Sequence, residues 1–320
     1  MIKTPAQQRA PDWLVWAALL VVYVVWGSTY LGIRLVVETM PPLLAASIRF
    51  VIAGLIIYGV LLARRGPRAL QLSPAELRGS AFVGAALLLG GNGLVMLGER
   101  DVPSGLAALI IAVVPLWVVV LRLLFGERIR VGTLIGVLLG FVGVAVLVVP
   151  RGVTGSVSSA GMLMLVAAGA SWAIGSYYSQ RVALPRDPIV ATATQLVLGG
   201  LALGLAGLVA GELGLVQVES FSERSIVAFV YLVTFGSILA YTAYTWLLQN
   251  ATVSKVATYA YVNPVVAIIL GWWVLAEEIN PSMIVGGAMI VLAVGLVVRT
   301  EARPAAPVGA LEVKPAGSAR

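Results

Sequence analysis

The sequence predicts an all-α polytopic membrane protein whose ten transmembrane helices form two inverted five-helix repeats. The first observation is composition: 60% of the 320 residues are apolar and 11% are charged, whereas soluble domains have about 45–50% apolar and about 25% charged residues. The second is that the apolar residues gather in ten stretches, each close to the roughly 20 residues that cross a bilayer core. The third is that motifs of the first half return in the second half, 146 to 150 residues later.

The ten predicted spans follow one another with short loops, which leave no room for a separate soluble domain. The first half holds 13–33, 43–63, 80–97, 104–121 and 131–149, and the second half holds 160–180, 189–210, 226–247, 256–275 and 282–298. The first stretch lacks a small-residue cleavage site, so we expect it to remain as a helix. We therefore predict an N-terminal segment at 1–12, five-helix repeats at 13–149 and 150–298, and a disordered Pro-, Ala- and Gly-rich tail at 299–320.

Two recurring motifs identify the repeat. The motif Trp-Gly-Ser-Thr-Tyr at 26–30 in the first span returns loosely at 172–177 in the sixth. The stronger recurrence is between the fourth and ninth spans. The segment that begins at Ser104 contains Pro115 and ends near Glu127, and the segment that begins at Ser254 contains Pro264 and ends near Glu277. A duplicated apolar half with a Pro inside a membrane-length stretch is typical of secondary transporters.

The basic residues predict the orientation in the membrane. Sixteen of the 21 Lys and Arg residues fall on the side of the N-terminus, four fall on the opposite side, and Arg49 lies within a span. By the positive-inside rule, both termini are expected to be cytoplasmic. The basic pI near 9.9 is thus an orientation signal, which favours the lipid bilayer and not nucleic acid as partner. Because each half has five spans, the second half enters from the other side, and inverted repeats place a binding site at their interface near the bilayer midplane.

The motif at 26–30 and the segment Tyr-Ala-Tyr-Val-Asn-Pro-Val-Val-Ala at 259–267 resemble the drug/metabolite transporter superfamily, in its EamA-type branch with the YedA-like exporters. The resemblance covers about residues 13–298. It implies a ten-helix transporter of the bacterial inner membrane that exports amino acids or other small metabolites. It also implies a central cavity lined by the first, third, fourth, sixth, eighth and ninth spans.

Two prolines lie near the middle of equivalent spans. Pro115 and Pro264 each remove a backbone hydrogen bond, which leaves the carbonyls of Ile111 and Ala260 to find other partners. Broken backbone is tolerated in a membrane only where protein or a watery cavity supplies those partners, so we expect both prolines to line a cavity; a packing kink is the alternative. Asn263, beside Pro264, can bind solute or bridge two helices.

Aromatic and hydroxyl side chains recur at spacings of three and four residues, which place them on one helix face. The sets are Tyr23, Trp26 and Tyr30; Trp172, Ser176 and Ser179; and Ser237, Tyr241 and Tyr244. With Ser28, with Tyr259 and with Asn92 in the glycine-rich third span, they predict an aromatic-walled cavity for an amphipathic solute. The interfacial aromatic belt is the alternative for Tyr30 and Tyr244, and an interhelical hydrogen bond is the alternative for Asn92.

Arg49 is the one clear charge within a predicted span, and a charge at the bilayer centre costs roughly 2.5–3.5 kcal/mol on insertion scales. Its place about six residues from the outer end of the span favours a structural interpretation, in which it extends toward that end or pairs with Glu38 or Glu99. The alternative is contact with an anionic group of the solute.

The leading hypothesis is an exporter of small amphipathic metabolites, aromatic or neutral amino acids or drug-like solutes, that works by alternating access without a cofactor. We find no His, and no Asp or Glu deep in any span, although proton relays in membranes normally use those groups. The first span carries Ser28 and Thr29 where the small four-helix multidrug relatives have a carboxylate. Facilitated diffusion is therefore favoured, with Glu38, Glu99 and Glu277 as rim carboxylates that allow weak coupling.

Other function classes have less support. The chain has no Cys or His, no metal-ligand cluster and no base for a Ser nucleophile other than Lys255, so we do not expect an enzyme. An importer or exchanger of an anionic or phosphorylated metabolite and a receptor or scaffold stay open as alternatives. Small-residue pairs such as Gly136 with Gly140, and Gly200 with Gly204, indicate close helix packing in a monomer or a weak homodimer.

Overall fold

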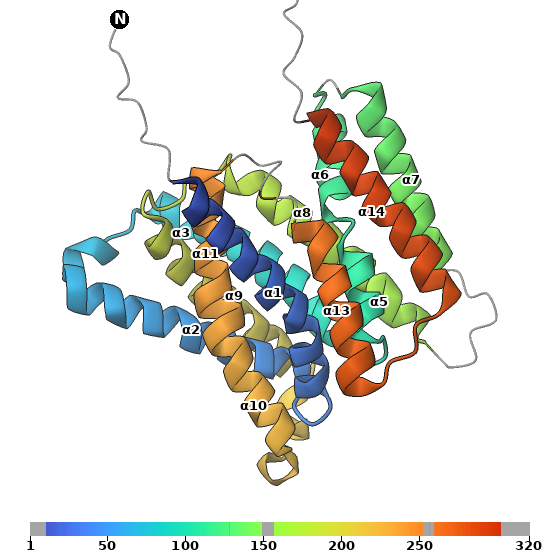
Figure 1. Cartoon of the computed structure of the whole chain (residues 1–320). Helices are drawn as coiled ribbons and strands as arrows, with labels where there is room; N and C mark the ends of the chain where they lie inside the picture. Colours follow the sequence, from blue (N-terminus) through green and yellow to red (C-terminus); the bar gives the residue numbers. More distant parts are fainter. Residues whose placement is uncertain (1–10, 128, 149–156, 252–255, 257–258, 302–320) are drawn as a thin grey trace, which may run out of the picture.

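The computed structural model describes residues 11–127, 129–148, 157–251, 256 and 259–301, and within these ranges the fold is helical without strands. Eight helical segments of these ranges are long and apolar enough to cross a membrane, and two shorter apolar helices lie at 131–147 and 262–275. Together they match the ten predicted spans (Figure 1). The predicted segment 1–12 and tail 299–320, and the motif around Ser254, fall mostly outside the described residues.

The first half contains five membrane-length segments in chain order. They are α1 (Asp12–Val37), α2 (Pro42–Arg65), a third segment made of α3 (Pro74–Gly84), a π-helix (Ala85–Gly93) and α4 (Leu94–Gly98), a fourth made of α5 (Ser104–Ile111) and α6 (Val114–Leu124), and α7 (Val131–Val148). The third segment begins with a capping box, in which the Ser73 hydroxyl accepts from the Glu76 N–H and the Glu76 carboxylate accepts from the Ser73 N–H.

The second half repeats this order. Its elements are α8 (Ser159–Ser179), α9 (Pro188–Val209), an eighth segment made of α10 (Glu223–Tyr231), a π-helix (Leu232–Leu239) and α11 (Ala240–Asn250), then α13 (Tyr259–Leu275) and α14 (Pro281–Glu301). Short 3₁₀ turns cover Pro67–Leu70, Glu212–Leu215 and Val218–Ser220. Pro188 at the start of α9 follows Asp187, whose carboxylate accepts from the N–H of Ile189, as expected for a helix N-terminus.

Both π-helices occupy the same place in their halves, in the third and the eighth membrane segments. Ala85–Gly93 and Leu232–Leu239 lie about 146 residues apart, the spacing of the sequence repeat. Glycine allows close packing here, since a Cβ at Gly91 would lie 2.8 Å from the Trp172 ring. A π-turn widens the helix and frees backbone groups, and such turns occur frequently at functional sites. The sequence pattern does not distinguish these two π-helices from the rest of their spans.

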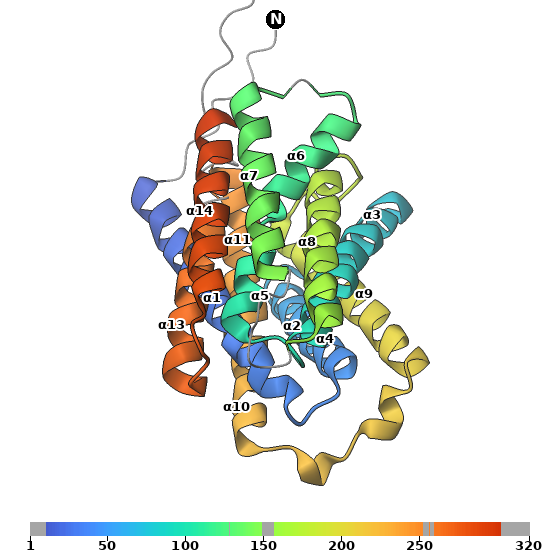
Figure 2. The same cartoon turned by 90° about the vertical axis from the view of Figure 1, so that its right-hand side faces the viewer.

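The main contacts between the two halves come in pairs, in which one contact repeats the other with the equivalent helices of the two halves exchanged. The second span pairs with the seventh (α2 with α9), and the fifth pairs with the tenth (α7 with α14). The contact of α1 with α13 is matched by that of α8 with α6, and the contact of α5 with α13 joins the two equivalent spans themselves. This exchange of partners is what an inverted repeat requires, and the helices cross as one bundle in both views (Figures 1 and 2).

The bundle has two ends, which we name by the chain. At the terminal end α1 begins and α14 ends, at the top of Figure 1, and the opposite end is the distal end. Carboxylates close helix N-termini at the distal end across the two halves. Glu277 accepts from the N–H groups of Ser104 (2.8 Å) and Gly105 (3.1 Å) at the start of α5. We call this contact the distal cap.

A second carboxylate contact joins the halves at the same end. Glu212 accepts from the N–H groups of Leu43 (3.1 Å) and Leu44 (2.9 Å) at the start of α2. Negative charge at a helix N-terminus is stabilised by the exposed N–H groups and the helix dipole. Both contacts therefore hold the distal end of the bundle together.

Candidate functional site

A central cavity of about 80 Å³ lies among residues of both halves. Its walls come from α1, α2, α4, α8, α11 and α13, from both π-helices, and from the junction of α5 and α6. Polar groups in the wall include Thr29, Arg49, Asn92 and Asn263, and the remaining lining is largely apolar and aromatic. The cavity therefore offers an apolar surface with a few polar groups, as solute sites usually do.

Trp26 is the centre of an aromatic cluster beside this cavity. Its ring centroid lies 4.8 Å from that of Tyr244, 5.6 Å from Tyr259, 5.9 Å from Trp172 and 6.4 Å from Tyr241. The Trp26 indole N–H donates to the carbonyl of Gly236, a residue of the second π-helix, at 3.3 Å. One side chain of the first half thus contacts four aromatic rings of the second half.

A second cavity of about 410 Å³ lies toward the terminal end. It shares Val114 and Tyr259 with the central cavity, so these residues separate the two spaces. From there its wall reaches Arg122 and Gln180, near the terminal ends of α6 and α8. We call it the terminal cavity.

The predicted residues fall into three groups. The central cavity is lined by Trp26, Tyr30, Arg49, Asn92, Trp172, Tyr241, Tyr259 and Asn263. The terminal cavity is lined by Pro115, Ser176, Tyr244 and, again, Tyr259. Ser28 and Pro264 line neither cavity. The Ser28 hydroxyl instead shares a 2.6 Å hydrogen bond with the Tyr231 hydroxyl and donates to the Val25 carbonyl at 2.8 Å.

The two equivalent prolines have different local structures. The fourth span breaks at Pro115, since α5 ends at Ile111 and α6 begins at Val114. Pro264, in contrast, lies inside the continuous helix α13. The prediction of a cavity-lining position fits Pro115 and does not fit Pro264, because the backbone around Pro264 packs on α1: a Cβ at Gly27 would lie 3.2 Å from the Asn263 carbonyl.

Asn263 both lines the cavity and bridges two helices. With its amide nitrogen turned toward the neighbouring carbonyls, it donates to those of Tyr259 and Tyr23, each at 3.2 Å. Tyr23 is on α1, so the bond joins the first and ninth spans. A hydrogen bond of this kind between membrane helices contributes about 1 kcal/mol or less.

Arg49 is buried, with 4% of its surface exposed, and it lines the central cavity. Its Nε donates to the Ser237 hydroxyl at 2.8 Å, and its guanidinium carbon lies 4.5 Å from the centre of the Phe50 ring. The expected extension to the outer end, or pairing with Glu38 or Glu99, is not what the structure has. The apolar cavity residues Ile33, Phe50 and Val95 were not singled out from the sequence, because nothing distinguishes them from other apolar residues of a span.

Glu99, expected at the rim, is buried at the distal end between the third and fourth spans, with no exposed surface. Neither of its carboxylate oxygens has a hydrogen-bond partner among the described residues, and Arg34 donates to its backbone carbonyl instead. Burial raises the pKa of Glu99 well above 4.5, and the nearby Glu277 carboxylate raises it further, while Arg34 opposes both effects. Glu99 is therefore protonated over a wider pH range than an exposed glutamate.

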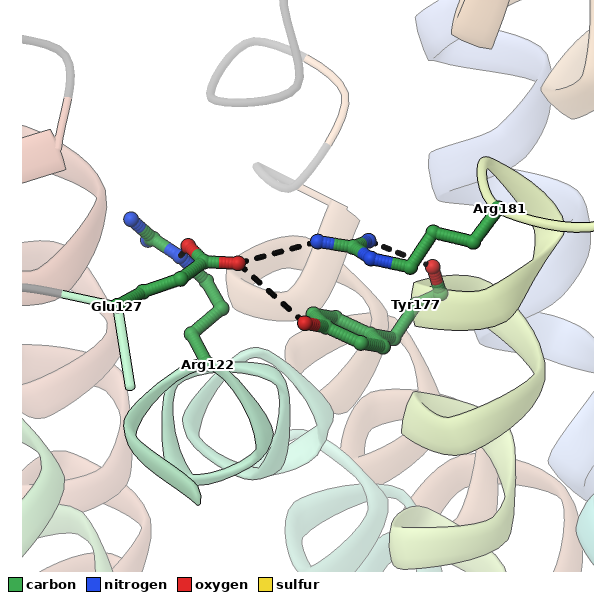
Figure 3. A network of polar contacts seen from close by, with 4 residues as sticks. All are labelled: Arg122, Glu127, Tyr177 and Arg181. Atoms are coloured by element: carbon green, nitrogen blue, oxygen red, sulfur yellow. Dashed lines mark hydrogen bonds and ion pairs between the residues drawn. The ribbon is translucent and has the colours of Figure 1, made fainter. Parts of the chain in front are cut away.

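A polar network lies at the terminal end (Figure 3). The Glu127 carboxylate accepts from Arg122 at 2.7 Å, from Arg181 at 3.0 Å and from the Tyr177 hydroxyl at 3.3 Å. The Arg181 guanidinium lies over the Tyr177 ring (Figure 3), with its carbon 3.5 Å from the ring centroid. The hydrogen bond from Arg122 is the main reason why the pKa of Glu127 is lowered. The network joins the end of the fourth span to the end of the sixth.

The ten apolar segments, the repeated order and the shared central cavity agree with the comparison to known families. The EamA-like transporter family matches this chain twice, at residues 13–149 and 159–299. The chain belongs to the EamA-like transporter family. The two matches correspond to the two five-helix halves, so this is a multi-pass membrane protein built from two copies of one transporter repeat.

Three relatives place the chain within the family. The inner membrane transporter YedA of Escherichia coli (strain K12) is 37% identical over 306 residues, which cover 95% of this chain and 97% of YedA. The transporter YvbV of Bacillus subtilis (strain 168) is 29% identical over 296 residues, covering 91% and 95% of the two chains. A WAT1-related chloroplast protein of Arabidopsis thaliana is 28% identical over 292 residues, covering 89% of this chain and 69% of the plant protein. The chain is thus a YedA-like member of the drug/metabolite transporter superfamily.

A solved structure has the same fold. A crystal structure of a protein with 19% sequence identity superposes with a TM-score of 0.63 and covers 91% of this chain and 99% of the other. At this identity the likeness concerns the fold alone.

Proposed function

We propose that this protein exports small amphipathic metabolites from the bacterial cytoplasm, in particular aromatic or neutral amino acids or drug-like solutes, by alternating access and without obligatory ion coupling. The observation that carries the proposal is the Trp26 cluster, in which rings of both halves meet beside a cavity with isolated polar groups. Flat aromatic faces bind apolar and aromatic groups of many shapes. The name of YedA as an inner membrane transporter supports the same membrane for this chain.

Alternating access is supported by the difference between the two ends. The distal end is held by the distal cap and by Glu212, whereas the terminal cavity of about 410 Å³ adjoins the central one. If the termini are cytoplasmic, as the positive-inside rule predicts, a solute reaches Trp26 from the cytoplasm. It leaves when the distal contacts open and the terminal cavity closes.

The central cavity must expand during this cycle. Its volume of about 80 Å³ is below the roughly 300–1,000 Å³ of small-molecule sites. Movement of Tyr259, which borders both cavities, joins the central space to the terminal one. We therefore expect solute binding to displace the Tyr259 ring from Trp26.

The test is uptake of labelled amino acids and a cationic drug into proteoliposomes, with and without an imposed pH gradient. Saturable uptake without the gradient is expected, and Trp26→Ala should lower the apparent affinity about tenfold, since an aromatic pair contributes about 0.5–1.5 kcal/mol and 1.4 kcal/mol is a factor of ten. Trp273→Ala is the matched control, because Trp273 is 75% exposed on the outside of the bundle. Uptake only with the gradient would contradict facilitated transport, and equal uptake by both variants would contradict the assigned site.

A further inference from the structure

We propose that the Arg49 guanidinium is the binding site for the carboxylate of the transported solute, with the solute's apolar part on the Trp26 cluster. This inference rests on the proposed transport function and narrows its substrate to amphipathic carboxylates, such as free amino acids. A guanidinium has five N–H donors, and Arg49 uses Nε for the Ser237 hydroxyl. Its Nη1 is buried and has no partner among the described residues.

The charge of Arg49 lacks a protein counter-charge. Arg49 forms no ion pair with any described residue, and no Asp or Glu is among the residues that line the central cavity. A buried cation without an anion costs several kcal/mol, unless a partner neutralises it. A carboxylate supplies the missing negative charge. It also has the right shape, because its two oxygens can accept two parallel N–H···O bonds from one guanidinium.

Holding the helices together does not require this charge. The position equivalent to Arg49 in the second half is Gln195, which lies 146 residues later. Gln195 is also buried and joins two spans with a neutral bond, since the Tyr241 hydroxyl donates to its side-chain oxygen at 3.2 Å. The neutral residue is sufficient for an interhelical contact there. The positive charge at Arg49 therefore needs another explanation, and binding of an anion supplies it.

Gly236 places the guanidinium next to the aromatic cluster. A Cβ at Gly236 would lie 3.1 Å from Nη2 of Arg49, so glycine leaves space for that group at the cavity wall. The carbonyl of the same residue accepts from the Trp26 indole N–H. The guanidinium of Arg49 and the ring of Trp26 thus both adjoin Gly236. An amino acid with an aromatic or branched side chain has this arrangement of carboxylate and apolar group.

Comparison of each amino acid with the matched amine isolates the contribution of the carboxylate to binding. In purified protein we would measure the binding of L-phenylalanine, L-leucine and L-tryptophan by thermal shift, and that of the two ligands without an indole ring also by quenching of tryptophan fluorescence. Phenethylamine, isoamylamine and tryptamine are the matched amines without the carboxylate, and inorganic phosphate is the competitor for a phosphate site. Wild-type protein is expected to bind at least one acid about 10- to 100-fold more tightly than its amine, because a hydrogen bond to a charged group contributes about 1.5–3 kcal/mol.

The variants test the residue. Arg49→Gln introduces the side chain that the second half uses, and we expect it to lose the preference for the acid over the matched amine, because its binding of the acid weakens. Arg49→Lys should recover part of the preference, since it keeps the charge but not the paired geometry. Arg224→Gln is the control for removal of an arginine. Ser237→Ala should cause a smaller loss of the preference for the acid than Arg49→Gln, because it removes the hydroxyl that accepts from Arg49 Nε and orients the guanidinium.

Several results would overturn the assignment. They are equal binding of acid and amine by the wild type, an unchanged preference in a folded Arg49→Gln variant, tighter competition by phosphate than by any of the acids, and no binding of any acid. Failure of the transport proposal can be distinguished from failure of the carboxylate site. Acid binding that depends on Arg49 in a protein without flux would leave the carboxylate site intact, whereas flux of the amines alone, unaffected by Arg49→Gln, would leave transport intact and reject the site.

Discussion

Removal of the Glu277 carboxylate should open the distal end of the bundle. The distal cap has two hydrogen bonds, of 2.8 Å and 3.1 Å, from the first N–H groups of α5 to a side chain that follows α13. A bond to a charged group contributes about 1.5–3 kcal/mol. Because Glu277 is only half-buried, solvent screening reduces this, and about 1 kcal/mol for each bond agrees with the range for helix N-caps.

The total of about 2 kcal/mol corresponds to a shift of about 30-fold in the equilibrium between a closed and an open distal end, since 1.4 kcal/mol is a factor of ten. The chain has no cysteine, so Ala107→Cys provides a single labelling site. Ala107 is fully buried on α5, three residues after Ser104. In the Ala107→Cys background, we expect Glu277→Ala to increase the rate of labelling by a charged maleimide about 30-fold.

Glu212→Ala is the matched control. Glu212 also accepts two N–H bonds at a helix start, but it joins α2 to the end of α9, and those two helices pack along each other. This change should lower the thermal midpoint without faster labelling of Ala107→Cys. The reasoning is refuted if Glu277→Ala leaves the labelling rate unchanged, or if Glu212→Ala raises it equally.

Three further predictions concern single positions. Gly27→Ala should lower the thermal midpoint in detergent, because a Cβ there would lie 2.6 Å from Cβ of Val266 and force α1 away from α13. A midpoint equal to that of wild type would show that these helices can move apart without a cost in stability. Ala276→Gly should raise the free energy of unfolding by about 1 kcal/mol, since Ala276 has a φ of 53° and the left-handed conformation costs about 1–2 kcal/mol for residues other than glycine; denaturant titration measures this, and no stabilisation would contradict it. Burial raises the pKa of Glu99 above 4.5, so its contribution to stability is present at low pH and is lost as the pH rises through the raised pKa. The thermal midpoint of wild type should therefore fall more with rising pH than that of Glu99→Gln, and parallel pH profiles would contradict a raised pKa.

The membrane segments could be predicted closely from sequence, because lipid requires long unbroken apolar stretches with internally satisfied backbone. The expected span 131–149 corresponds to α7 at Val131–Val148, and the expected span 189–210 corresponds to α9 at Pro188–Val209. The repeat also predicted a binding site at the interface of the two halves, and residues of both halves line the central cavity. Eight of the predicted residues line the central cavity, since aromatic and polar groups with helical spacing are easily distinguished from an aliphatic background.

The remaining features depend on contacts between distant segments. Ser28 has the spacing of its neighbours, yet its hydroxyl bonds to Tyr231, 203 residues away. Arg49 is close enough to a helix end to extend there, but Ser237, 188 residues later, holds it inside. The π-helices likewise follow from the way in which both segments pack around the cavity, and local propensity contains no signal for them.

The unequal conformations of Pro115 and Pro264 have a consequence for the form of the protein that faces the other way. Inverted repeats can produce that form when each half adopts the present conformation of its partner. In this structure the break is in the first half, at Ile111–Val114, and the helix around Pro264 is continuous. After the exchange the fourth span should be straight and the ninth should bend at Pro264. The two prolines would then act as alternate hinges of one cycle, each bent when the other is extended, and spin-label distances along the two spans should change in opposite directions.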